Sequence, residues 1–305
     1  MMKHKLPPIY FLHIPKTAGS SLGQLILCSY PQGSQLNCSL SQLLQMSREE
    51  ISQFKCFAGH WGTGLFSLLD KEISSITMLR DPFERTVSNC LFIKRIVVKK
   101  FASNPLALDE VEDLKLKSDI SELLKCTNIR EMLNLMPSMK EQQSCYLGCD
   151  IDLNEYLGVS QCSLDTLDKS KEIFIENIIA QQLSSGLLDI NEIFNKAKQR
   201  LDAMEVVGIM EQFNDSAHLI CNSLGISTPK NLPRENVSPE NLALGNLTYR
   251  KSGTIPDDVI KQIDELTVCD REIYEYGKKL FNKQLQTEKR KFFWFKKMFK
   301  KSERF

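Results

Sequence analysis

The sequence predicts an α/β fold, a three-layer sandwich with a mostly parallel central sheet and a helical insertion after the third strand. Four short apolar runs begin near residues 9, 54, 75 and 205, and segments with helical apolar spacing follow them. Strands that alternate with helices pair in parallel within one sheet, which helices cover on both faces. The mostly polar, helix-like stretch 101–203 predicts the insertion. With 305 residues, the chain can bury the core of one large domain.

The first apolar run ends in the clearest chemical signal of the chain. Residues 9–14 are apolar and aromatic, and a helical pattern begins at Leu22, so a buried strand and a helix flank a short loop. The loop supplies a cation, several hydroxyl groups, a glycine for close backbone approach and the free amides of a helix N-terminus. These groups suit an oxyanion such as a phosphate or sulfate ester. The loop reads Pro15-Lys16-Thr17-Ala18-Gly19-Ser20-Ser21.

The order of residues in this loop disfavours an ordinary ATP or GTP site. A Walker-type loop has a glycine, four residues and then Gly-Lys-Ser/Thr, so its lysine follows the glycines. Here Lys16 precedes Gly19, and no glycine stands before it in the loop. A P-loop-like kinase acting on a small molecule is kept as an alternative, which a Mg²⁺-dependent ATPase activity would favour.

The second apolar run places a histidine at the end of a strand. Residues 54–58 predict a buried strand, and Gly59 and Gly62 flank the pair His60-Trp61. Ligands of open α/β sheets bind at the carboxyl ends of the strands, so His60 is a candidate site residue. The alternative is a histidine packed beneath Trp61 for structural reasons. His13, inside the first run, is interpreted as a core histidine.

The third run, residues 75–80, predicts a strand followed directly by a helix. Asp81 is a good N-cap, Pro82 suits the first helical position, and Glu84 is placed to complete a capping box. Arg85 is interpreted as an ion-pair partner of Glu84 or Asp81.

Two polar side chains beside this helix suit a terminal phosphate. Arg80 stands at the end of the predicted strand, and Ser88 lies about two turns into the helix. A guanidinium fork binds a phosphate through two parallel hydrogen bonds, and a hydroxyl adds a third.

The two motifs together resemble the donor-binding sequences of carbohydrate sulfotransferases, and the first is close to that of the heparan-sulfate 2-O-sulfotransferase group. The resemblance implies a P-loop-like fold and transfer of a sulfuryl group from 3′-phosphoadenosine 5′-phosphosulfate to an acceptor hydroxyl, on a carbohydrate. It covers residues 8–100 strongly and 204–282 more loosely. The segment between them, which varies with substrate in the family, has no match.

The resemblance also implies roles for particular residues. Lys16 would neutralise the charge that develops on the leaving oxygen, and His60 would take the proton of the acceptor hydroxyl. Arg80 and Ser88 would bind the 3′-phosphate. A loop at 232–253 would close over the nucleotide, which makes Arg250 and Lys251 further candidates. No metal is required. The residues implied to hold the 5′-phosphate are Lys16, Thr17, Ala18, Gly19, Ser20 and Ser21.

The remaining elements complete one domain and leave a tail. Residues 205–211 predict a fourth strand, with a helix at 216–224 that Asn214 and Asp215 cap, and 255–281 predicts one amphipathic helix. Glu211 is interpreted either as a further site residue or as a structural one. We therefore assign residues 1–285 to a sulfotransferase domain, with its insertion at about 101–203, and 286–305 to a basic aromatic tail.

Charge separates this tail from the rest of the chain. Residues 289–305 hold eight Lys or Arg and one Glu, a net +7, which leaves −6 for the remainder of a chain whose total is +1. On a helical projection of 292–301, the lysines share one face, and the other is formed by Phe292, Trp294, Phe295, Met298 and Phe299. This pattern is typical of a helix that lies on an anionic membrane surface. The alternatives are a disordered tail or a helix docked on the domain. The acidic remainder argues against nucleic acid as a partner.

The cellular compartment that the sequence predicts also sets the expected oxidation state of the cysteines. The sequence shows no secretory signal and no apolar run long enough to cross a membrane, which predicts a cytoplasmic protein, peripheral on the membrane if the tail binds lipid. Reduced thiols follow from that placement. Cys145, Cys149 and Cys162 are clustered in sequence, and whether they interact is left open.

A third functional class is a non-catalytic, membrane-associated binding module with the same fold. The presence of Lys16, His60, Arg80 and Ser88 together argues against it. The sequence does not identify the acceptor hydroxyl.

Overall fold

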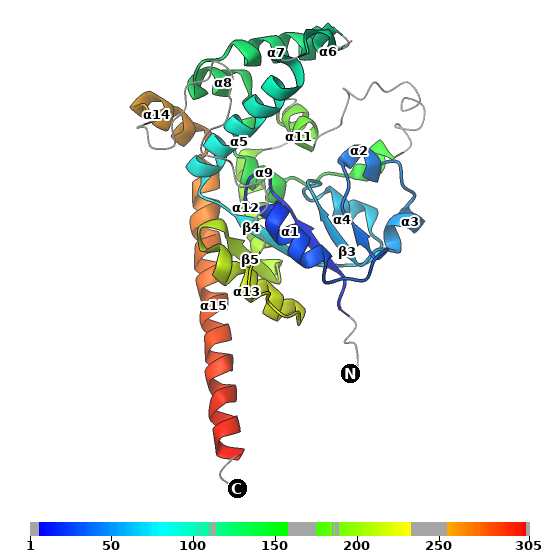
Figure 1. Ribbon diagram of the computed structural model, residues 1–305, viewed down its shortest axis with the longest axis vertical. Coiled ribbons are helices and arrows are strands. Elements are labelled where there is room, and N and C mark those ends of the chain that lie inside the picture. Colours follow the sequence, from blue (N-terminus) through cyan, green and yellow to red (C-terminus); the bar gives the residue numbers. More distant parts are fainter. Residues whose placement is uncertain are drawn as a thin grey trace.

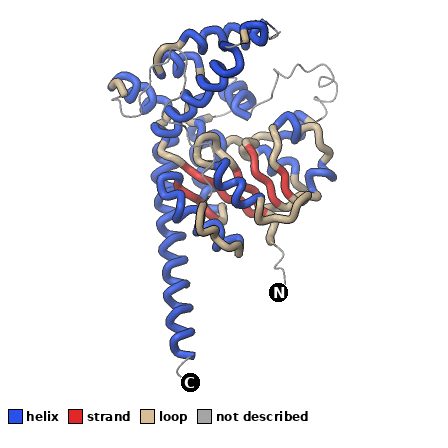
Figure 2. The backbone as a smooth tube through the Cα atoms, in the orientation of Figure 1, coloured by secondary structure: helices blue, strands red, loops and turns tan. Residues whose placement is uncertain are grey.

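The computed structural model describes residues 6–102, 104–109, 111, 114–157, 175–184, 186, 189–232 and 255–302. Its centre is a five-stranded sheet in the order β2-β3-β1-β4-β5. All four strand pairings are parallel. Figures 1 and 2 show helices on both faces of this sheet. The α/β three-layer prediction is therefore confirmed. The strands are β1 (Ile9–Leu12), β2 (Gln35–Leu36), β3 (Cys56–Gly59), β4 (Ser74–Leu79) and β5 (Val206–Ile209).

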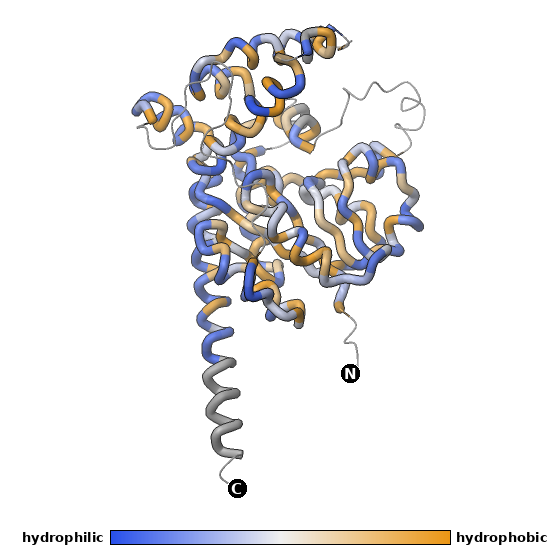
Figure 3. Tube along the Cα trace, viewed as in Figure 1, coloured by the Kyte–Doolittle hydropathy of each residue, from blue (hydrophilic) through white to orange (hydrophobic). Residues whose placement is uncertain are grey.

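The position of β1 in the sheet determines which loops meet. β1 is buried along its whole length, and Ile9 pairs with Cys56 of β3 on one side and with Ser74 of β4 on the other. The loop after β1 therefore lies between the segments that follow β3 and β4. Figure 3 shows the hydrophobic residues concentrated in these strands. β2 is a difference from the sequence-based prediction, because its two residues are too few to give a periodic pattern.

The helices around the sheet are mostly short. Those of the first half are α1 (Gly19–Leu27), α2 (Leu40–Leu43), α3 (Arg48–Ser52), α4 (Gly64–Leu68), α5 (Pro82–Val97), α6 (Pro105–Asp109), α7 (Leu114–Lys125) and α8 (Ile129–Leu135). Those of the second half are α9 (Gln142–Gly148), α11 (Ile175–Ser184), α12 (Ile190–Ala203), α13 (Phe213–Leu224), α14 (Asp257–Leu266) and α15 (Val268–Ser302). α13 begins three residues before the predicted start, and no side chain caps it.

The predicted insertion consists of two structurally different parts. Its first part, with α6, α7 and α8, packs with α5 and α14 around two small hydrophobic clusters of its own, at the top of Figure 1. Its second part belongs to the main core, because Tyr146 of α9 and Ile193 and Leu201 of α12 are buried with the strands. α9 and α12 are therefore part of the main domain core.

Two buried carboxylates join this region to the C-terminal helix. Asp270 accepts hydrogen bonds from two backbone N–H groups in the first turn of α9, at 3.1 and 2.7 Å. Glu141, just before α9, accepts from two N–H groups at the start of α15, at 3.0 and 2.8 Å. Each carboxylate thus satisfies the free donors of the other's helix. The single helix predicted at 255–281 is wrong, since it divides at Thr267 where this reciprocal capping begins α15.

α15 continues without interruption past residue 286, where the sequence predicted the start of a separate tail. Its C-terminal end projects beyond the rest of the molecule in Figure 1. Over the described residues, none of the helices combines the length and the apolar character needed to cross a membrane.

Candidate active site

The loop between β1 and α1 turns sharply. Lys16 and Ala18 both have left-handed backbone conformations, with φ of 70° and 63°. The Thr17 side chain is buried, and its hydroxyl donates to the Ile14 carbonyl at 2.8 Å, which fixes the turn from inside. α1 then begins at Gly19, so the amides of its first turn have no acceptor within the helix. This combination of alternating backbone conformations and a helix start forms a concave site for an anion.

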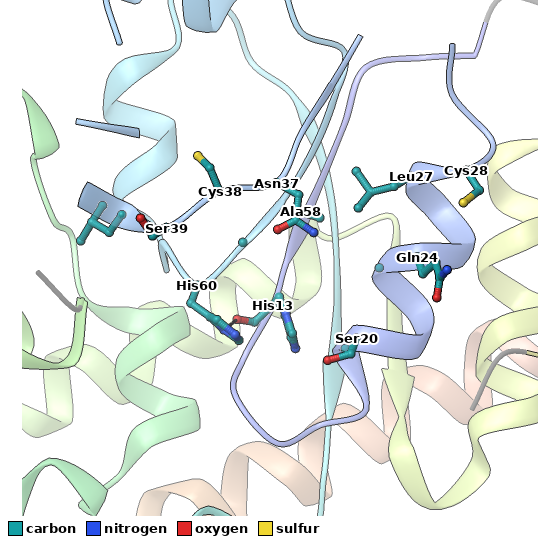
Figure 4. Close-up of a pocket in the computed structure, with 14 residues that line it drawn as sticks. His13, Ser20, Gln24, Leu27, Cys28, Asn37, Cys38, Ser39, Ala58 and His60 are labelled. Carbon is teal, nitrogen blue, oxygen red and sulfur yellow. Dashed lines mark hydrogen bonds between the residues drawn. The ribbon is translucent and has the colours of Figure 1, made fainter. Parts of the chain in front are cut away.

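Gly19 is required by a contact that the sequence did not indicate. A Cβ atom at this position would lie 1.8 Å from the His13 ring. β1 ends at Leu12, and His13 is half-buried at the mouth of the loop, so the prediction of a core histidine is wrong. Its ring stacks on Phe11 on one side and lies 4.1 Å from the His60 ring on the other. Figure 4 shows the two imidazoles side by side near Ser20.

Lys16 lies on the side of the loop that faces β4 and α5. Its ammonium group stands 4.1 Å above the ring of Phe92, an exposed residue of α5. Burial, together with the positive charges of Arg95 and Arg80, lowers the pKa of Lys16 to about 8. The nearby cations leave this region with excess positive charge. An anionic ligand would compensate that charge.

Arg80 connects the loop to the strand that follows it in the sheet. Its guanidinium Nη1 donates to the Lys16 carbonyl at 3.1 Å, and its Nη2 lies 3.6 Å from the Glu84 carboxylate. The Gln143 carboxamide holds the Arg80 backbone on both sides, accepting from its N–H at 3.0 Å and donating to its carbonyl at 2.9 Å. Ser88 is half-buried on α5, two turns beyond.

The start of α5 confirms some details of the prediction and corrects others. Asp81 caps the helix, accepting from the Glu84 N–H at 3.0 Å, and Pro82 occupies the first turn. The capping box is wrong, because the Asp81 N–H instead donates to the Glu211 carboxylate at 3.0 Å. Tyr274 donates to the same carboxylate at 2.9 Å. Glu211 therefore has a structural position that ties β5, α5 and α15 together.

Arg85 is not the surface ion-pair partner that its neighbours suggested. The side chain is fully buried, and its guanidinium donates to the Gln142 carboxamide. The ion pair with Glu84 belongs to Arg80 instead. The helical direction of α5 turns Arg85 inward toward α9, which sequence spacing alone does not reveal.

His60 follows β3 and is held from both sides. A Cβ at Gly59 would lie 2.4 Å from the Trp61 ring, so this glycine lets the indole pack inward. Trp61 is fully buried, and its Nε1 donates to the Cys38 carbonyl at 3.2 Å. His60 itself is exposed, which contradicts the alternative of a histidine packed beneath Trp61.

The hydrogen bond between the two histidines selects a tautomer. His60 Nδ1 lies 2.9 Å from the His13 carbonyl oxygen. A carbonyl only accepts hydrogen bonds, so Nδ1 carries the proton and Nε2 is left with its lone pair, as a general base requires. The tautomer is thus assigned from the hydrogen-bond partner.

Both histidines are held neutral at physiological pH. The protein atoms packed around each ring lower the pKa of His13 well below its usual value and lower that of His60. Repulsion from Lys16 adds to the lowering at both rings, and repulsion from His60 adds to it at His13. The hydrogen bond to the His13 carbonyl and the Glu176 carboxylate oppose the shift at His60. A neutral imidazole can accept a proton.

A pocket of about 560 Å³ opens beside the two histidines. Its walls are α1 and residues 37–40, its floor is Ala58 and Gly59, and its inner end is formed by His13 and His60 (Figure 4). We call it the α1 groove. None of Lys16, Arg80 and Ser88 lines it.

The structure thus brings together Lys16, Arg80 and His60 around one loop, with the amides of Gly19, Ser20 and Ser21 between them. Arg250 and Lys251 lie outside the described residues, as does Cys162. Cys145 of α9 and Cys149, directly after that helix, are both buried. The sequence did not indicate that His13, Phe92 and Gln143 belong to this region. Polar residues at the ends of parallel strands gather at one edge of the sheet, and this rule could have identified His13.

Across the described ranges, no three or more His, Cys, Asp or Glu side chains gather as a metal site would need. No curated protein matches the chain. A family model described as the sulfotransferase family matches residues 1–284, which is nearly the whole chain and includes the predicted insertion. Taken with the parallel sheet and the anion-binding loop, this match shows that the chain belongs to the sulfotransferase family, a family of transferases.

Proposed function

We propose that this protein transfers a sulfuryl group from 3′-phosphoadenosine 5′-phosphosulfate to a hydroxyl group of a carbohydrate. The observation that carries the proposal is that different chemical groups lie on the two sides of the β1–α1 loop. Cations lie on its β4 side, where Arg80 donates to the Lys16 carbonyl, and a neutral imidazole with a free Nε2 lies on its β3 side. A sulfuryl group held at the loop would have a charge-stabilising group and a base on opposite sides.

The donor would bind through groups already placed for it. The backbone amides from Thr17 to Ser21, in the β1–α1 loop and the start of α1, suit the 5′-phosphate, and Arg80 and Ser88 are proposed to bind the 3′-phosphate. Arg250 and Lys251 are proposed as further contacts to the nucleotide. Burial, together with the positive charges of Arg95 and Arg80, lowers the Lys16 pKa to about 8, and a bound polyanionic donor would relieve the charge repulsion.

The reaction needs one proton acceptor and one group that stabilises the leaving oxygen. His60 Nε2 would take the proton of the acceptor hydroxyl while that oxygen forms its bond to sulfur. The bond between sulfur and the bridging phosphate oxygen breaks at the same time, and Lys16 would donate a hydrogen bond to the oxygen that leaves with the nucleotide. His13 would keep the His60 ring oriented through its carbonyl.

The family match favours sulfuryl transfer over the kinase alternative. The closer resemblance to the heparan-sulfate 2-O group stays a hypothesis that rests on the order of residues 15–21. A direct test is incubation with ³⁵S-labelled donor and a panel of glycans, lipids and phenols. Label in a carbohydrate supports the proposal, and label only in phenols or lipids contradicts the acceptor part of it. Incubation with [γ-³²P]ATP and Mg²⁺ in parallel tests the kinase alternative.

The basic end of α15 would hold the protein on an anionic membrane. Basic residues near such a surface contribute about 1 kcal/mol each, and interfacial aromatic residues add to this. A chain that ends at Gln286 keeps Gln284, which bonds to the β5 backbone, and removes most of the positive charge. We expect the full chain, and not the shortened one, to sediment with phosphatidylserine vesicles at low salt. Equal sedimentation of both would overturn this proposal.

A further inference from the structure

The α1 groove lies on the side of β1 opposite the cations. Because β3 and β4 flank β1, the segments after them reach the loop from opposite directions. The groove is built from α1, residues 37–40 and the end of β3, whereas Lys16 and Arg80 lie toward β4 and α5. His60 closes the inner end of the groove, so a molecule in it would present an atom to Nε2.

The groove contains no formal charge. Among the described residues that line it, there is no Lys, Arg, Asp or Glu. Its hydrogen-bonding side chains are neutral: the carboxamides of Gln24 and Asn37, both on exposed residues, the hydroxyls of Ser20 and Ser39, and the imidazoles. Leu27 and Ala58 supply apolar surface. Both imidazoles stay uncharged at physiological pH because burial lowers their pKa values.

These properties point to a class of acceptor, and the inference rests on the proposed function. We propose that the α1 groove binds an uncharged, hydroxyl-bearing acceptor, such as the terminal unit of a neutral glycan, rather than an acidic polysaccharide. The volume of about 560 Å³ is within the range of ~300–1,000 Å³ of small-molecule sites. Carboxamides each donate and accept, which matches hydroxyl groups that do both.

An acidic acceptor would meet no Lys or Arg side chain among the described residues that line this groove. Proteins recognise carboxylate and sulfate groups through Arg and Lys, which bind them with charge-assisted hydrogen bonds. A carboxylate moved from water into a groove of neutral groups loses hydration without gaining such a partner. The groove therefore discriminates against the charged member of two otherwise similar acceptors.

The first experiment uses matched acceptors that differ in one charged group. p-Nitrophenyl β-xyloside and p-nitrophenyl β-glucuronide share their ring and aglycone, and only the second carries a carboxylate. With ³⁵S-labelled donor, we expect kcat/KM for the xyloside to exceed that for the glucuronide by tenfold or more. Equal values, or a preference for the glucuronide, would overturn the proposal.

A second experiment looks for a gain of activity, which misfolding cannot imitate. Gln24→Lys places a cation in the groove and should raise the glucuronide-to-xyloside ratio of kcat/KM at least tenfold. Gln53→Lys, at an exposed position after α3, is the matched control and should leave the ratio unchanged. A Gln24→Lys ratio equal to the wild-type ratio contradicts the assignment of the groove.

A third measurement separates this inference from the proposed function, because it needs no transfer. Cys28 is an exposed free thiol at the groove. Saturating xyloside should slow its alkylation by iodoacetamide, and the glucuronide at equal concentration should not. If no acceptor is sulfated yet the xyloside alone protects, the proposed function fails and the groove chemistry stands. If sulfation occurs and neither or both glycosides protect, the groove assignment fails.

Discussion

The two sides of the β1 carboxyl end differ sharply in charge. Toward β4 and α5, Lys16 lies near Arg80 and Arg95, and burial, with the repulsion from these two cations, lowers the Lys16 pKa to about 8. Toward β3 and α1, the hydrogen-bonding side chains carry imidazoles, carboxamides and hydroxyls. One loop therefore separates a half that suits a polyanion from a half that can accept a proton.

The two halves are not electrostatically independent. The positive charge of Lys16 contributes to lowering the pKa of both His13 and His60, after the larger effect of burial. A cation that would stabilise the leaving group thus also helps keep the base neutral. Cations on one side of β1 and neutral imidazoles on the other thus allow a single loop to serve both anion binding and proton transfer.

The largest expected effect comes from removing the cation at the centre of the β4 side. Lys16→Ala should lower kcat for sulfuryl transfer by about a hundred- to a thousandfold, as the loss of a donor to a developing oxyanion does. The affinity for the product nucleotide should fall much less, because the loop amides and Arg80 remain. Single-turnover kinetics and calorimetry measure the two. Lys71→Ala, at an exposed lysine before β4, is the control. Equal losses in binding and turnover would contradict the role.

Removing the base from the β3 side should affect turnover without affecting the donor. We expect His60→Ala to lower kcat about a hundredfold or more while nucleotide affinity is unchanged. In the wild type, the rate should fall only at pH values below the usual histidine pKa of 6.5, since the pKa of His60 is lowered and protonation abolishes its function. That acidic limb should vanish in the variant. His218→Ala, an exposed histidine on α13, should retain both rate and limb. Near-normal turnover in His60→Ala would exclude this base.

Substitution of Arg80 tests whether the β4 side binds the 3′-phosphate. The wild type should bind adenosine 3′,5′-bisphosphate about ten- to a hundredfold more tightly than AMP, because a charge-assisted contact contributes about 1.5–3 kcal/mol. Arg80→Gln should remove most of that ratio, as measured by calorimetry. Arg48→Gln, which removes the ion pair with Asp70 and the hydrogen bond to Asn154, both remote from the loop, should preserve it. If Arg80→Gln leaves this affinity ratio unchanged, the 3′-phosphate binds to other residues.

The smallest expected effect is a pH dependence of donor binding on the β4 side. Because the Lys16 pKa is lowered to about 8, its charge is present below that pH and is lost as the pH rises through it. Affinity for adenosine 3′,5′-bisphosphate should therefore decline several-fold between pH 7 and 9, and binding near pH 8 should take up protons. Calorimetry in buffers of different ionisation enthalpy detects that uptake. Lys16→Met should bind without this dependence, and a persistent decline would assign it to another group.

Local patterns were enough for much of this molecule. The strands that precede Lys16, His60 and Arg80 lie in mostly apolar runs, and each run ends at a polar or glycine-containing segment. Order along the chain therefore indicated position at the sheet edge. The Asp81 cap and Pro82 are likewise signals within a few residues of one another. The two-residue β2 carried no such pattern, and its pairing with β3 is long-range.

By itself, then, the sequence determined the parallel α/β fold and which residues stand at strand ends. Only the tertiary structure decided what those residues face. His13 joined the site because Gly19 leaves room for its ring, and Arg85 became buried because α5 turns it toward α9. Depressed pKa values and an uncharged groove arise from burial and from charges on separate elements. The physical reason is that periodicity and capping act between near neighbours in the chain, whereas desolvation and Coulomb forces depend on distance in space.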